Sequence, residues 1–497
     1  MIRTLLVANR GEIAVRIART ARDMGIEPVA VYSESDAGAF HTTRMPHAVS
    51  LGAGAPSETY LSIPRLLEAA ERAGADAVHP GYGFLSENAD FARAVEESSR
   101  IWVGPPPAAI EEMGDKLRAR ARMQASGVPV VPGSDLRAQT DAELASEAAR
   151  MGFPVLVKAA AGGGGKGMSR VDSAEDLPGA LEEGRRVAAS AFADDRVYLE
   201  KLLARPHHVE FQIFGDGAGQ VLHLFERECS VQRRHQKIVE ETPSPALDSA
   251  LRRRMGEAAV EAARAVGYVG AGTVEMLLDE KRNFYFLEMN TRLQVEHPIT
   301  EETLGIDLVR AQLDVAAGGR IPDGWARLSP RGHAIELRLY AEDPVEFLPR
   351  TGTILDYAEP AGPGIRVDSG VAAGSRVGVE FDPLLAKLVV FGSDRRSAIE
   401  RARRALREWV VLGVETNRPL LEAVLGSEEF AGGRYATDLV ERLPARPSRE
   451  IPDAAWIAAA SAFEARSSAG AGVASRDGSA AGGSDPWEAG GGWRPGA

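Results

Sequence analysis

The sequence contains a single cysteine, Cys229, and lacks any long apolar run. One cysteine cannot form a disulfide within the chain, which favours a reducing compartment. No apolar stretch approaches the roughly 20 residues that a membrane-spanning helix requires. The short hydrophobic stretch at the N-terminus is interrupted by Asn9, Arg10 and Glu12, which argues against a signal peptide. We therefore expect a cytoplasmic protein that does not associate with a membrane.

An excess of basic charge is also absent, because the formal net charge is −13, and this argues against a nucleic-acid partner. Two phosphate-binding signatures are missing as well. No G-x-G-x-x-G follows the first predicted strand, and the glycine run at 162–167 does not have P-loop spacing. The composition of 44% hydrophobic and 26% charged residues is ordinary for a globular protein. The length of 497 residues predicts two to four domains.

The order of strand and helix patterns predicts three folded parts and a tail. Residues 1–114 alternate strands and helices, such as the strand Thr4–Ala8 and the helix Glu12–Met24, which predicts an α/β domain with a mostly parallel sheet. Residues 115–330 and 331–445 have α+β patterns, and the second of these contains an Arg-rich helix at Ser397–Val411. Ala, Gly and Ser dominate residues 446–497, which predicts a flexible tail. Further strands are expected at Val155–Ala159, Val197–Glu200, Val209–Phe214, Gln220–Glu226, Thr273–Leu278, Asn283–Glu288, Gly332–Tyr340 and Leu384–Phe391.

The stretch EMNTRLQVEHP, Glu288–Pro298, is the most informative part of the chain. Alternate side chains of an extended segment share one face, so five polar groups should point the same way. Carboxylate and amide oxygens beside a guanidinium suit Mg²⁺, phosphate and an anionic second substrate. A solvated strand edge is the plainer interpretation, but matching motifs elsewhere in the chain argue against it. The five residues are Glu288, Asn290, Arg292, Gln294 and Glu296.

Glu275 and Glu288 lie on two predicted strands joined by the turn-like sequence DEKRN. A hairpin would bring the two carboxylates together, and they would repel each other unless a cation lay between them. We therefore predict a Mg²⁺ site that Asn290 completes. Two exposed strand acids are the alternative, but the apolar neighbours, Met276 and Phe286 among them, favour a semi-buried site.

Two further segments carry polar chemistry. Lys158 follows a predicted strand and precedes the glycine run 162–167, which suggests a mobile lid over phosphate, although a glycine run can also be a simple turn. The charged stretch Glu226–Lys237 would ordinarily be a solvated loop, but its opposite charges could also surround an anion. Within it, Cys229 is more consistent with a packed thiol than with a nucleophile.

In these motifs the chain resembles the biotin carboxylases of biotin-dependent acyl-CoA carboxylases, which are ATP-grasp enzymes. The resemblance extends over about residues 1–445 and includes acetyl-, propionyl- and methylcrotonyl-CoA carboxylase types, with a leaning towards the carboxylases of larger acyl-CoAs. The matching segments are LLVANRGEIAVRIAR, HPGYGFLSEN, KAAAGGGGKGM, RRHQKIVEE, GTVEMLL, EMNTRLQVEHPITE, GHAIELRLYAEDP and FDPLLAKLVVFG.

The resemblance implies a fold and a set of site residues. It implies a Rossmann-like domain over 1–114, an ATP-grasp domain over 115–330 with a mobile glycine-rich lid at about 131–204, and a C-terminal α+β domain over 331–445. Glu275, Glu288 and Asn290 would bind two Mg²⁺ or Mn²⁺ ions. The catalytic residues would be Lys237, Arg292, Glu296 and Arg338. The cofactor-binding residues would be Lys116, Lys158, Gly163, Gly164, Gly165, Glu200, Lys201, Leu203, His208, His235 and Leu277 for nucleotide, Gln294 and Val295 for bicarbonate, and Tyr82 and Gly83 for biotin.

The activity implied is the first half-reaction of an acyl-CoA carboxylase. Glu296 would deprotonate bicarbonate, which attacks the γ-phosphoryl of ATP to give carboxyphosphate. Arg338 and Arg292 would then stabilise the biotin enolate-like oxygen. The family attaches biotin within a Met-Lys-Met motif, and none of the ten methionines here precedes a lysine. We therefore expect two partners, a separate biotin carrier and a carboxyltransferase subunit. We also expect a homodimer, and a tail that is a remnant of a carrier-linking domain.

Two other functions are compatible with parts of this pattern. Another ATP-grasp ligase would share the nucleotide residues, but the LVANRGEIA and RRHQKIVEE segments argue against it. A non-catalytic nucleotide-sensing subunit would not need the complete set of Lys237, Arg292 and Glu296. The acyl-CoA that is finally carboxylated would be chosen by the carboxyltransferase and is not encoded in these residues.

Overall fold

The structure is a computed structural model that describes residues 2–134, 140–160, 168–192, 194–444 and 461. The chain divides into residues 1–443 and 444–497, and every element named below lies in the first of these parts. The predicted tail at 446–497, apart from Ser461, and the glycine run at 162–167 lie outside the described residues. No helix in the described ranges is both long and apolar enough to span a bilayer.

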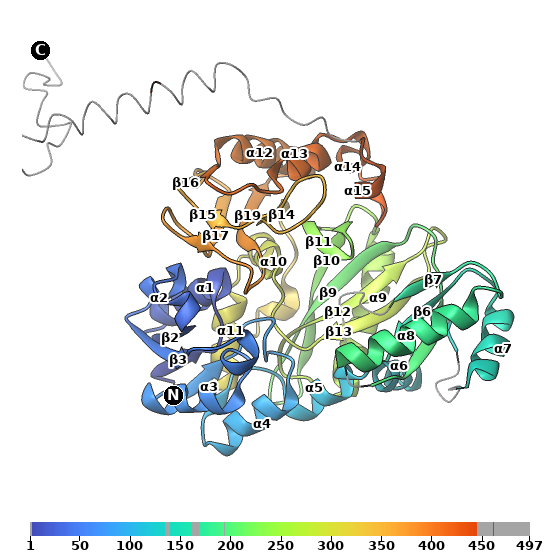
Figure 1. Cartoon of the computed structure of the whole chain (residues 1–497), viewed down its shortest axis with the longest axis horizontal. Helices are drawn as coiled ribbons and strands as arrows, with labels where there is room; N and C mark the ends of the chain where they lie inside the picture. The colour runs from blue at the N-terminus through green and yellow to red at the C-terminus, as the bar shows by residue number, and fades with distance from the viewer. Residues whose placement is uncertain (1, 135–139, 161–167, 193, 445–460, 462–497) are drawn as a thin grey trace, which may run out of the picture. The chain divides into compact units, whose positions relative to one another are not determined.

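The N-terminal sheet, whose strands β2 and β3 are labelled in Figure 1, has five parallel strands in the order β3-β2-β1-β4-β5. This order changes direction between β1 and β4, and open α/β sheets bind ligands at such a point. The predicted Rossmann-like domain is confirmed. Its strands are β1 (Thr4–Val7), β2 (Glu27–Ser33), β3 (His47–Gly52), β4 (Ala77–His79) and β5 (Ile101–Trp102). Its helices are α1 (Gly11–Asp23), α2 (Phe40–Thr43), α3 (Ile63–Arg72), α4 (Ala89–Glu97) and α5 (Pro107–Gly114), with 3₁₀ turns at Glu34–Asp36 and Pro56–Glu58.

Asn9 connects the loops that follow β1 and β4. Its Nδ2 donates hydrogen bonds to the carbonyl oxygens of Pro80, at 2.7 Å, and Tyr82, at 2.8 Å. Gly81 between them has a φ of +65°, and a Cβ there would lie 2.9 Å from the Asn9 side chain. Only glycine fits this close approach without strain. The loop therefore holds Tyr82 in a fixed position beside the start of α1.

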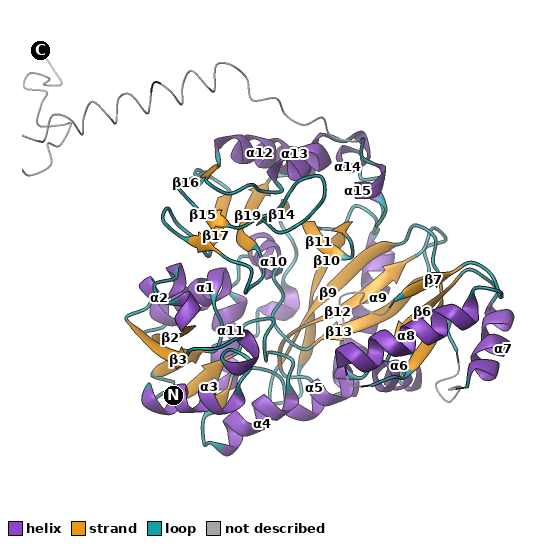
Figure 2. Ribbon diagram, in the orientation of Figure 1, coloured by secondary structure: helices purple, strands orange, loops and turns teal. Residues whose placement is uncertain are grey.

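The central sheet has eight antiparallel strands in the order β13-β12-β9-β10-β11-β14-β19-β17 (Figure 2). It runs continuously from strands β9–β13 to the C-terminal strands, because β11 pairs with β14. Its strands are β9 (His207–Gly215), β10 (Val221–Arg233), β11 (Gln236–Thr242), β12 (Gly270–Leu278), β13 (Phe284–Asn290), β14 (His333–Tyr340), β17 (Ile365–Ser369) and β19 (Leu384–Gly392).

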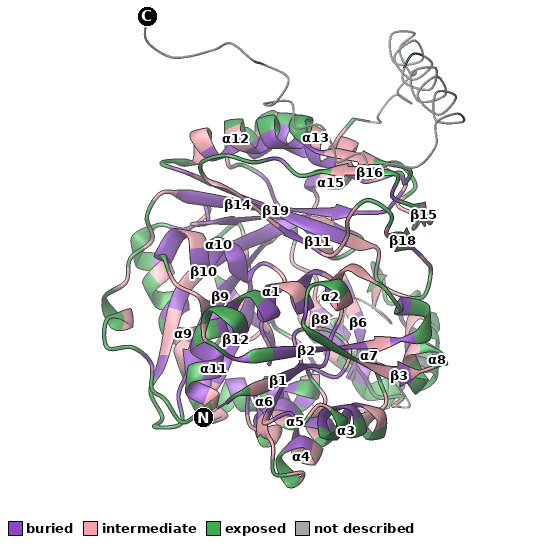
Figure 3. Cartoon of the chain, turned by 90° about the vertical axis from the view of Figure 1, so that its left-hand side faces the viewer, coloured by how far each residue is buried: buried purple, intermediate pink, exposed green. Residues whose placement is uncertain are grey.

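Helices cover this sheet on both sides. Helix α9 (Ser249–Ala265) packs on β9 and β10, and α10 (His297–Leu304) packs on β10, β11, β14 and β19. Strands β14 and β19 are buried beneath α12 (Arg395–Glu408) and α13 (Arg418–Gly426), whose outer faces are exposed (Figure 3). The remaining elements are α6 (Lys116–Ala125), α11 (Leu308–Ala316), α14 (Glu428–Ala431), α15 (Leu439–Arg442), a 3₁₀ turn at Trp325–Arg327, and the short pairs β15 (Gly352–Thr353) with β18 (Arg376–Val377) and β16 (Asp356–Ala358) with β20 (Val410–Leu412).

A small separate sheet carries the predicted lid region. Its three antiparallel strands are in the order β7-β6-β8, and the helices α7 and α8 pack against them. Leu144, Leu181 and Leu199 belong to its own hydrophobic core. The elements are β6 (Val155–Ala159), β7 (Ser169–Val171), β8 (Val197–Lys201), α7 (Asp141–Met151) and α8 (Leu177–Phe192).

Two expectations from the sequence are wrong in detail. The helix predicted over Ser397–Val411 ends at Glu408, because Trp409 takes an extended conformation and Val410–Leu412 pairs with β16. The extended segment predicted through Glu296 ends as a strand at Asn290, and Glu296 precedes the first turn of α10. For the charged stretch after Glu226, which the sequence left open between a solvated loop and charges ordered around an anion, the solvated loop is excluded, because β10 continues to Arg233 and is largely buried.

Candidate active site

A cavity of about 860 Å³ lies between the N-terminal loops, the lid sheet, the β12–β13 hairpin and the C-terminal strands. Nearly all of the predicted site residues that the structure describes line it. Glu296 is the exception, because it is fully buried behind the cavity wall. Gly163, Gly164 and Gly165 lie outside the described residues. The lining includes Tyr82, Gly83, Lys116, Lys158, Glu200, Lys201, Leu203, His208, His235, Lys237, Glu275, Leu277, Glu288, Asn290, Arg292, Gln294, Val295 and Arg338.

The lid end of the cavity holds cations and one carboxylate. Lys158 on β6 forms an ion pair with Glu200 on β8, and Arg120 approaches the same carboxylate at 3.3 Å. Lys201 instead donates to two backbone oxygens, Gly152 at 2.8 Å and Phe153 at 3.1 Å. Burial lowers the pKa of Lys116, although Glu288 partly offsets this. These groups give this end of the cavity the donors that a polyphosphate requires.

The hairpin pair lies as predicted, because Glu275 and Glu288 are direct cross-strand partners. Glu275 Oε1 accepts hydrogen bonds from Lys237 Nζ at 2.7 Å and Asn290 Nδ2 at 2.9 Å, and Oε2 lies 2.8 Å from His208 Nε2. Burial would raise the pKa of Glu275, but Lys237 and His208 lower it far below its ordinary value. Burial and the neighbouring Glu275 charge raise the pKa of Glu288.

This donor set fits a divalent cation. Glu288 makes no ion pair with any residue that the structure describes, so its charge is not offset by direct contact. The amide oxygen of Asn290 lies on the same strand, two residues further on, and accepts from Arg292 at 3.0 Å. Two carboxylates and an amide oxygen are the ligands that Mg²⁺ prefers.

Lys237 lies at the centre of a buried charge cluster. Its ammonium donates to Glu210, to Glu275, and to Glu296 Oε1 at 2.8 Å. Burial would lower the pKa of Lys237, but the three carboxylates raise it well above its ordinary value. Arg227 supports this cluster from β10 by donating to Glu210 Oε1 at 2.6 Å.

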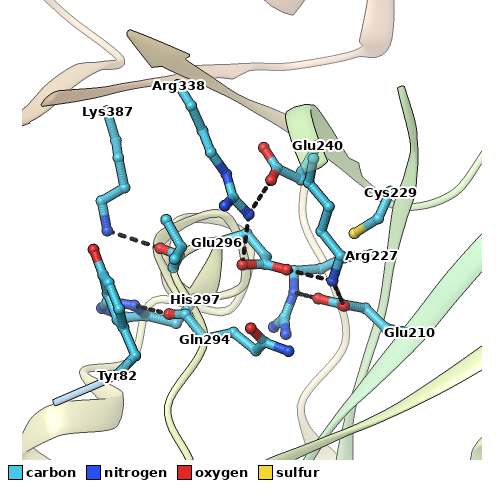
Figure 4. Close-up of polar contacts among 12 residues, drawn as sticks. Tyr82, Glu210, Arg227, Cys229, Glu240, Gln294, Glu296, His297, Arg338 and Lys387 are labelled. Carbon is cyan, nitrogen blue, oxygen red and sulfur yellow. Dashed lines mark hydrogen bonds and ion pairs between the residues drawn. The ribbon is translucent and has the colours of Figure 1, made fainter. Parts of the chain in front are cut away.

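Glu296 is held between two cations (Figure 4). Its Oε2 accepts from Arg338 at 2.9 Å, and its Oε1 accepts from Lys237. Burial would raise the pKa of Glu296, but Lys237 and Arg338 lower it well below its ordinary value. The carboxylate is therefore ionised in the free protein, and its two cations separate it from the cavity.

Tyr82 and Gly83, which the family resemblance assigns to biotin, line the same cavity as Arg338. The Tyr82 hydroxyl donates to Glu12, and Lys387 lies 3.2 Å from the same Glu12 oxygen. Lys387 also donates to the carbonyl oxygen of Val295 at 2.7 Å. One fully buried ammonium thus links the predicted bicarbonate segment to the residue that orients Tyr82.

Four of the five polar residues of the 288–296 segment, all except Glu296, line the cavity, and hydrogen bonds of Arg292 connect two of them. Arg292 donates to Asn290 Oδ1 at 3.0 Å and to Gln294 Oε1 at 2.8 Å. Its Nε donates to Glu87 Oε2 at 2.8 Å, which connects the hairpin to the N-terminal domain. The prediction that all five side chains lie on one extended face is therefore wrong for Glu296, and the strand itself ends at Asn290.

Sequence reasoning missed several charged residues around the site, and their signals are weak. Glu210 alternates with apolar residues in β9, a pattern that usually means a solvated face. Glu87 is one polar residue among several in a loop. Lys387 stands within the apolar run LLAKLVV, and a lysine there suggests a buried partner. The residues are Glu12, Glu87, Glu210, Arg227, Glu240 and Lys387.

Comparison with known proteins identifies relatives over the whole first part of the chain. Residues 1–110 match the family model "Biotin carboxylase, N-terminal domain", residues 115–323 match "Carbamoyl-phosphate synthase L chain, ATP binding domain", and residues 336–442 match "Biotin carboxylase C-terminal domain". The chain is 48% identical to a biotin carboxylase of Halalkalibacterium halodurans over 440 residues, 88% of this chain and 97% of the relative. It is also 48% identical to biotin carboxylase 2 of Bacillus subtilis over 443 residues, 89% of this chain and 100% of the relative.

Solved structures give the same result. The biotin carboxylase of Campylobacter jejuni, in a complex described as β-γ-ATP, superposes with a TM-score of 0.87 at 42% identity, covering 89% of this chain and 99% of that one. The biotin carboxylase domain dimer of the Hydrogenobacter thermophilus 2-oxoglutarate carboxylase, in complex with MgADP, ADP and bicarbonate, superposes with a TM-score of 0.86 at 42% identity. This second match covers 90% of this chain and 100% of that one.

Proposed function

The chain belongs to the biotin carboxylase family, and from this premise we propose which of its residues perform the reaction. The reaction is the ATP-dependent carboxylation of biotin, the first half-reaction of biotin-dependent carboxylases. ATP, Mg²⁺, bicarbonate and biotin take part in it. We propose a division into an N-terminal domain over 1–114, an ATP-grasp domain over 115–330 with its lid, and a C-terminal domain over 331–445.

The cluster around Lys237 carries the assignment. It places a buried carboxylate, Glu296, beside the cations that an anionic substrate would contact. Bicarbonate bound to Lys237 and Arg292 would cancel part of the positive charge that keeps the Glu296 pKa low. The proton affinity of Glu296 then rises, and it can accept the proton of bicarbonate. The general base is thus activated by the substrate that it deprotonates.

The deprotonated bicarbonate oxygen attacks the γ-phosphorus, the bond to the β–γ bridging oxygen breaks, and ADP and carboxyphosphate form. Nucleotide binding is assigned to Lys116, Lys158, Lys201, Leu203, His208 and Leu277, all of which line the cavity. Mg²⁺ held by Glu275, Glu288 and Asn290 would offset charge on the phosphates. Water exclusion depends on closure of the lid sheet over the cavity.

Carboxyphosphate breaks down to CO₂ and phosphate. The phosphate takes the proton from the ureido nitrogen of biotin, and that nitrogen then forms its bond to CO₂. Arg338, which extends from β14 towards Tyr82 and Glu296, stabilises the enolate-like oxygen of deprotonated biotin by a charge-assisted contact.

Biotin-dependent carboxylases combine such a subunit with carrier and carboxyltransferase functions. We propose that this chain carboxylates biotin on a separate carrier and works with a carboxyltransferase subunit. The absence of a Met-Lys pair within residues 1–497 supports this proposal. A homodimer is also proposed, on the basis of the dimer described for the Hydrogenobacter thermophilus domain.

The experiment is phosphate release by the purified chain with Mg²⁺, ATP and bicarbonate, with and without free biotin, beside Glu296→Gln. We expect release that requires bicarbonate, that biotin stimulates, and that falls about 10²- to 10⁴-fold in the variant, because a proton acceptor is lost. Bicarbonate-dependent hydrolysis that ignores biotin would indicate a different ATP-grasp ligase. Tight ATP binding without any hydrolysis would indicate a nucleotide-sensing subunit.

A further inference from the structure

Glu240 is a buried carboxylate that no step of the proposed reaction uses. It lies on β11, directly across from Glu336 on β14, and Arg338 follows Glu336 by two residues. Residues two apart on a strand share a face, so Glu336 and Arg338 point the same way. Glu240 and Glu336 are completely buried, and Arg338 is 6% exposed. All three belong to the face of the sheet that α10 covers.

Arg338 has two carboxylate partners, and both contact the same nitrogen. Its NH2 group lies 2.9 Å from Glu296 Oε2 and forms a second, shorter ion pair with Glu240 Oε1 (Figure 4). Its Nε has no hydrogen-bond partner among the described residues. The position of the guanidinium therefore depends on these two acids.

The proposed reaction adds a proton to one of them. When Glu296 accepts the bicarbonate proton, it becomes neutral and no longer balances Arg338. A buried guanidinium without a counter-charge is strongly unfavourable and would move towards another partner. Glu240 is the acid in contact with Arg338 that the reaction leaves unchanged.

Glu336 cannot serve as the counter-charge of Arg338, although it lies directly opposite Glu240. Its two oxygens have no hydrogen-bond partner in the described part of the chain, and burial raises its pKa well above the ordinary value. Like charges placed opposite each other in a sheet repel, and among the described residues only Glu240 of this pair has a cation in contact with it, so ionisation of the pair favours Glu240. Glu240 carries the negative charge.

We propose that Glu240 is a positioning residue of this site, which holds Arg338 in place for biotin while Glu296 carries the proton of bicarbonate. The assignment rests on the proposed roles of Glu296 and Arg338. It gives Arg338 a permanent acidic partner and a temporary one. The Arg338 guanidinium can then keep its position for the enolate-like oxygen of biotin, both while bicarbonate is deprotonated and while biotin is carboxylated.

The surroundings of Glu240 predict a pH dependence. Burial raises the pKa of Glu240 to about 7, while Arg338 and Lys237 act to lower it. Protonation of Glu240 would release Arg338, so biotin-dependent turnover should fall as the pH drops through neutrality. The charged and titratable groups that face Glu240 are Lys237 on β11, Glu336, Arg338 and Tyr340 on β14, Glu296 at the start of α10 and Cys229 on β10, with Lys387 on β19 beyond Glu336.

The test measures biotin-stimulated phosphate release by the full chain between about pH 6 and 9, where an acid with a pKa near neutrality would show. The variants are Glu240→Gln, Glu240→Asp and the matched control Glu336→Gln, whose amide imitates the protonated acid. We expect Glu240→Gln to lower kcat about 10²-fold, the usual effect of misplacing a reacting group by about 1 Å. Its KM for ATP should not change, and the decline of activity below neutrality should disappear. Glu336→Gln and Glu240→Asp should keep that decline.

The outcomes separate this proposal from the proposed function. If the wild-type chain shows no bicarbonate-dependent, biotin-stimulated phosphate release, both the proposed function and the Glu240 proposal are contradicted. If the wild type is active and a folded Glu240→Gln keeps its kcat and pH profile, the Glu240 proposal alone fails. Equal losses in Glu336→Gln and Glu240→Gln would show a packing effect and overturn it as well. If Glu240→Gln does not fold, the pH profiles of the wild type and of Glu336→Gln decide. The Glu240 proposal is overturned if the activity of these two proteins does not decline below neutral pH.

Discussion

Glu240 and Glu241 are neighbours on β11, and their side chains lie on opposite faces of the central sheet. Glu241 accepts hydrogen bonds from His333 Nε2 at 2.6 Å, Arg395 Nε at 2.6 Å, Arg395 NH2 at 2.9 Å and the Tyr435 hydroxyl. Glu240 has an ion pair with Arg338 and no hydrogen bond from any other described residue. Both are buried to the same extent, so only their partners differ.

The pKa values of the two acids move in opposite directions. Burial acts to raise both, but His333 and Arg395 lower the pKa of Glu241 to about 2. The pKa of Glu240 is instead raised to about 7. On the face of the sheet under α12 and α13, the Glu241 carboxylate is therefore fully paired with cations and hydrogen-bond donors, and this pairing stabilises the fold. The face towards the cavity leaves its charges partly unsatisfied, which suits a site that must bind and release anions.

The largest expected effect is the loss of Glu241. Glu241→Gln should destabilise the protein by about 3 to 5 kcal/mol, because Arg395 and His333 lose a buried counter-charge. Urea denaturation followed by circular dichroism measures this loss. The control is Glu400→Gln, which removes the exposed partner of Arg396 on α12. An exposed pair contributes about 0.5 kcal/mol or less. Equal effects of the two substitutions would refute a structural role for the Glu241 network.

The next expected effect is a pH dependence of stability that Glu241 contributes. Its pKa is about 2 in the folded protein against an ordinary value of 4.5. The contribution is therefore fully present above about pH 5, and it is lost as the pH falls from there towards 2. The difference is worth about 3 kcal/mol. Stability curves of wild type and Glu241→Gln should converge as the pH falls. Parallel curves over that range would contradict the lowered pKa.

The sequence predicted the elements whose signals are local. The strand predicted over Thr4–Ala8 and the helix predicted over Glu12–Met24 came from apolar patterns, and their ends differ from those of β1 and α1 by no more than one residue. The pairing of Glu275 with Glu288 was predictable because a short polar turn separates two apolar strands. These features need only patterns within about 30 residues.

Contacts between distant segments were not predictable from spacing. Arg292 and Glu87 are 205 positions apart, and Arg395 and Glu241 are 154 apart. The sequence VEE likewise gives no reason why one acid should be saturated and the next should not. The difference arises when β11 pairs with β14 and α12 packs on the opposite face. The roles of single residues came from the family resemblance, and the structure supplies their physical basis.

The smallest expected effect is the change in stability when Glu240, on the other face of β11, is replaced. Glu240→Gln should change the free energy of unfolding by about 1 kcal/mol or less. The substitution removes an ionised carboxylate that burial disfavours, which stabilises the folded protein, and a buried amide without partners costs about 1 to 3 kcal/mol. Arg338 keeps Glu296 as its counter-charge in the resting protein, so no buried cation is left unpaired. Urea denaturation beside Glu241→Gln measures the contrast. A loss as large as that of Glu241→Gln would mean that both faces stabilise the fold equally. A small loss combined with impaired turnover would assign Glu240 to the reaction and Glu241 to the fold.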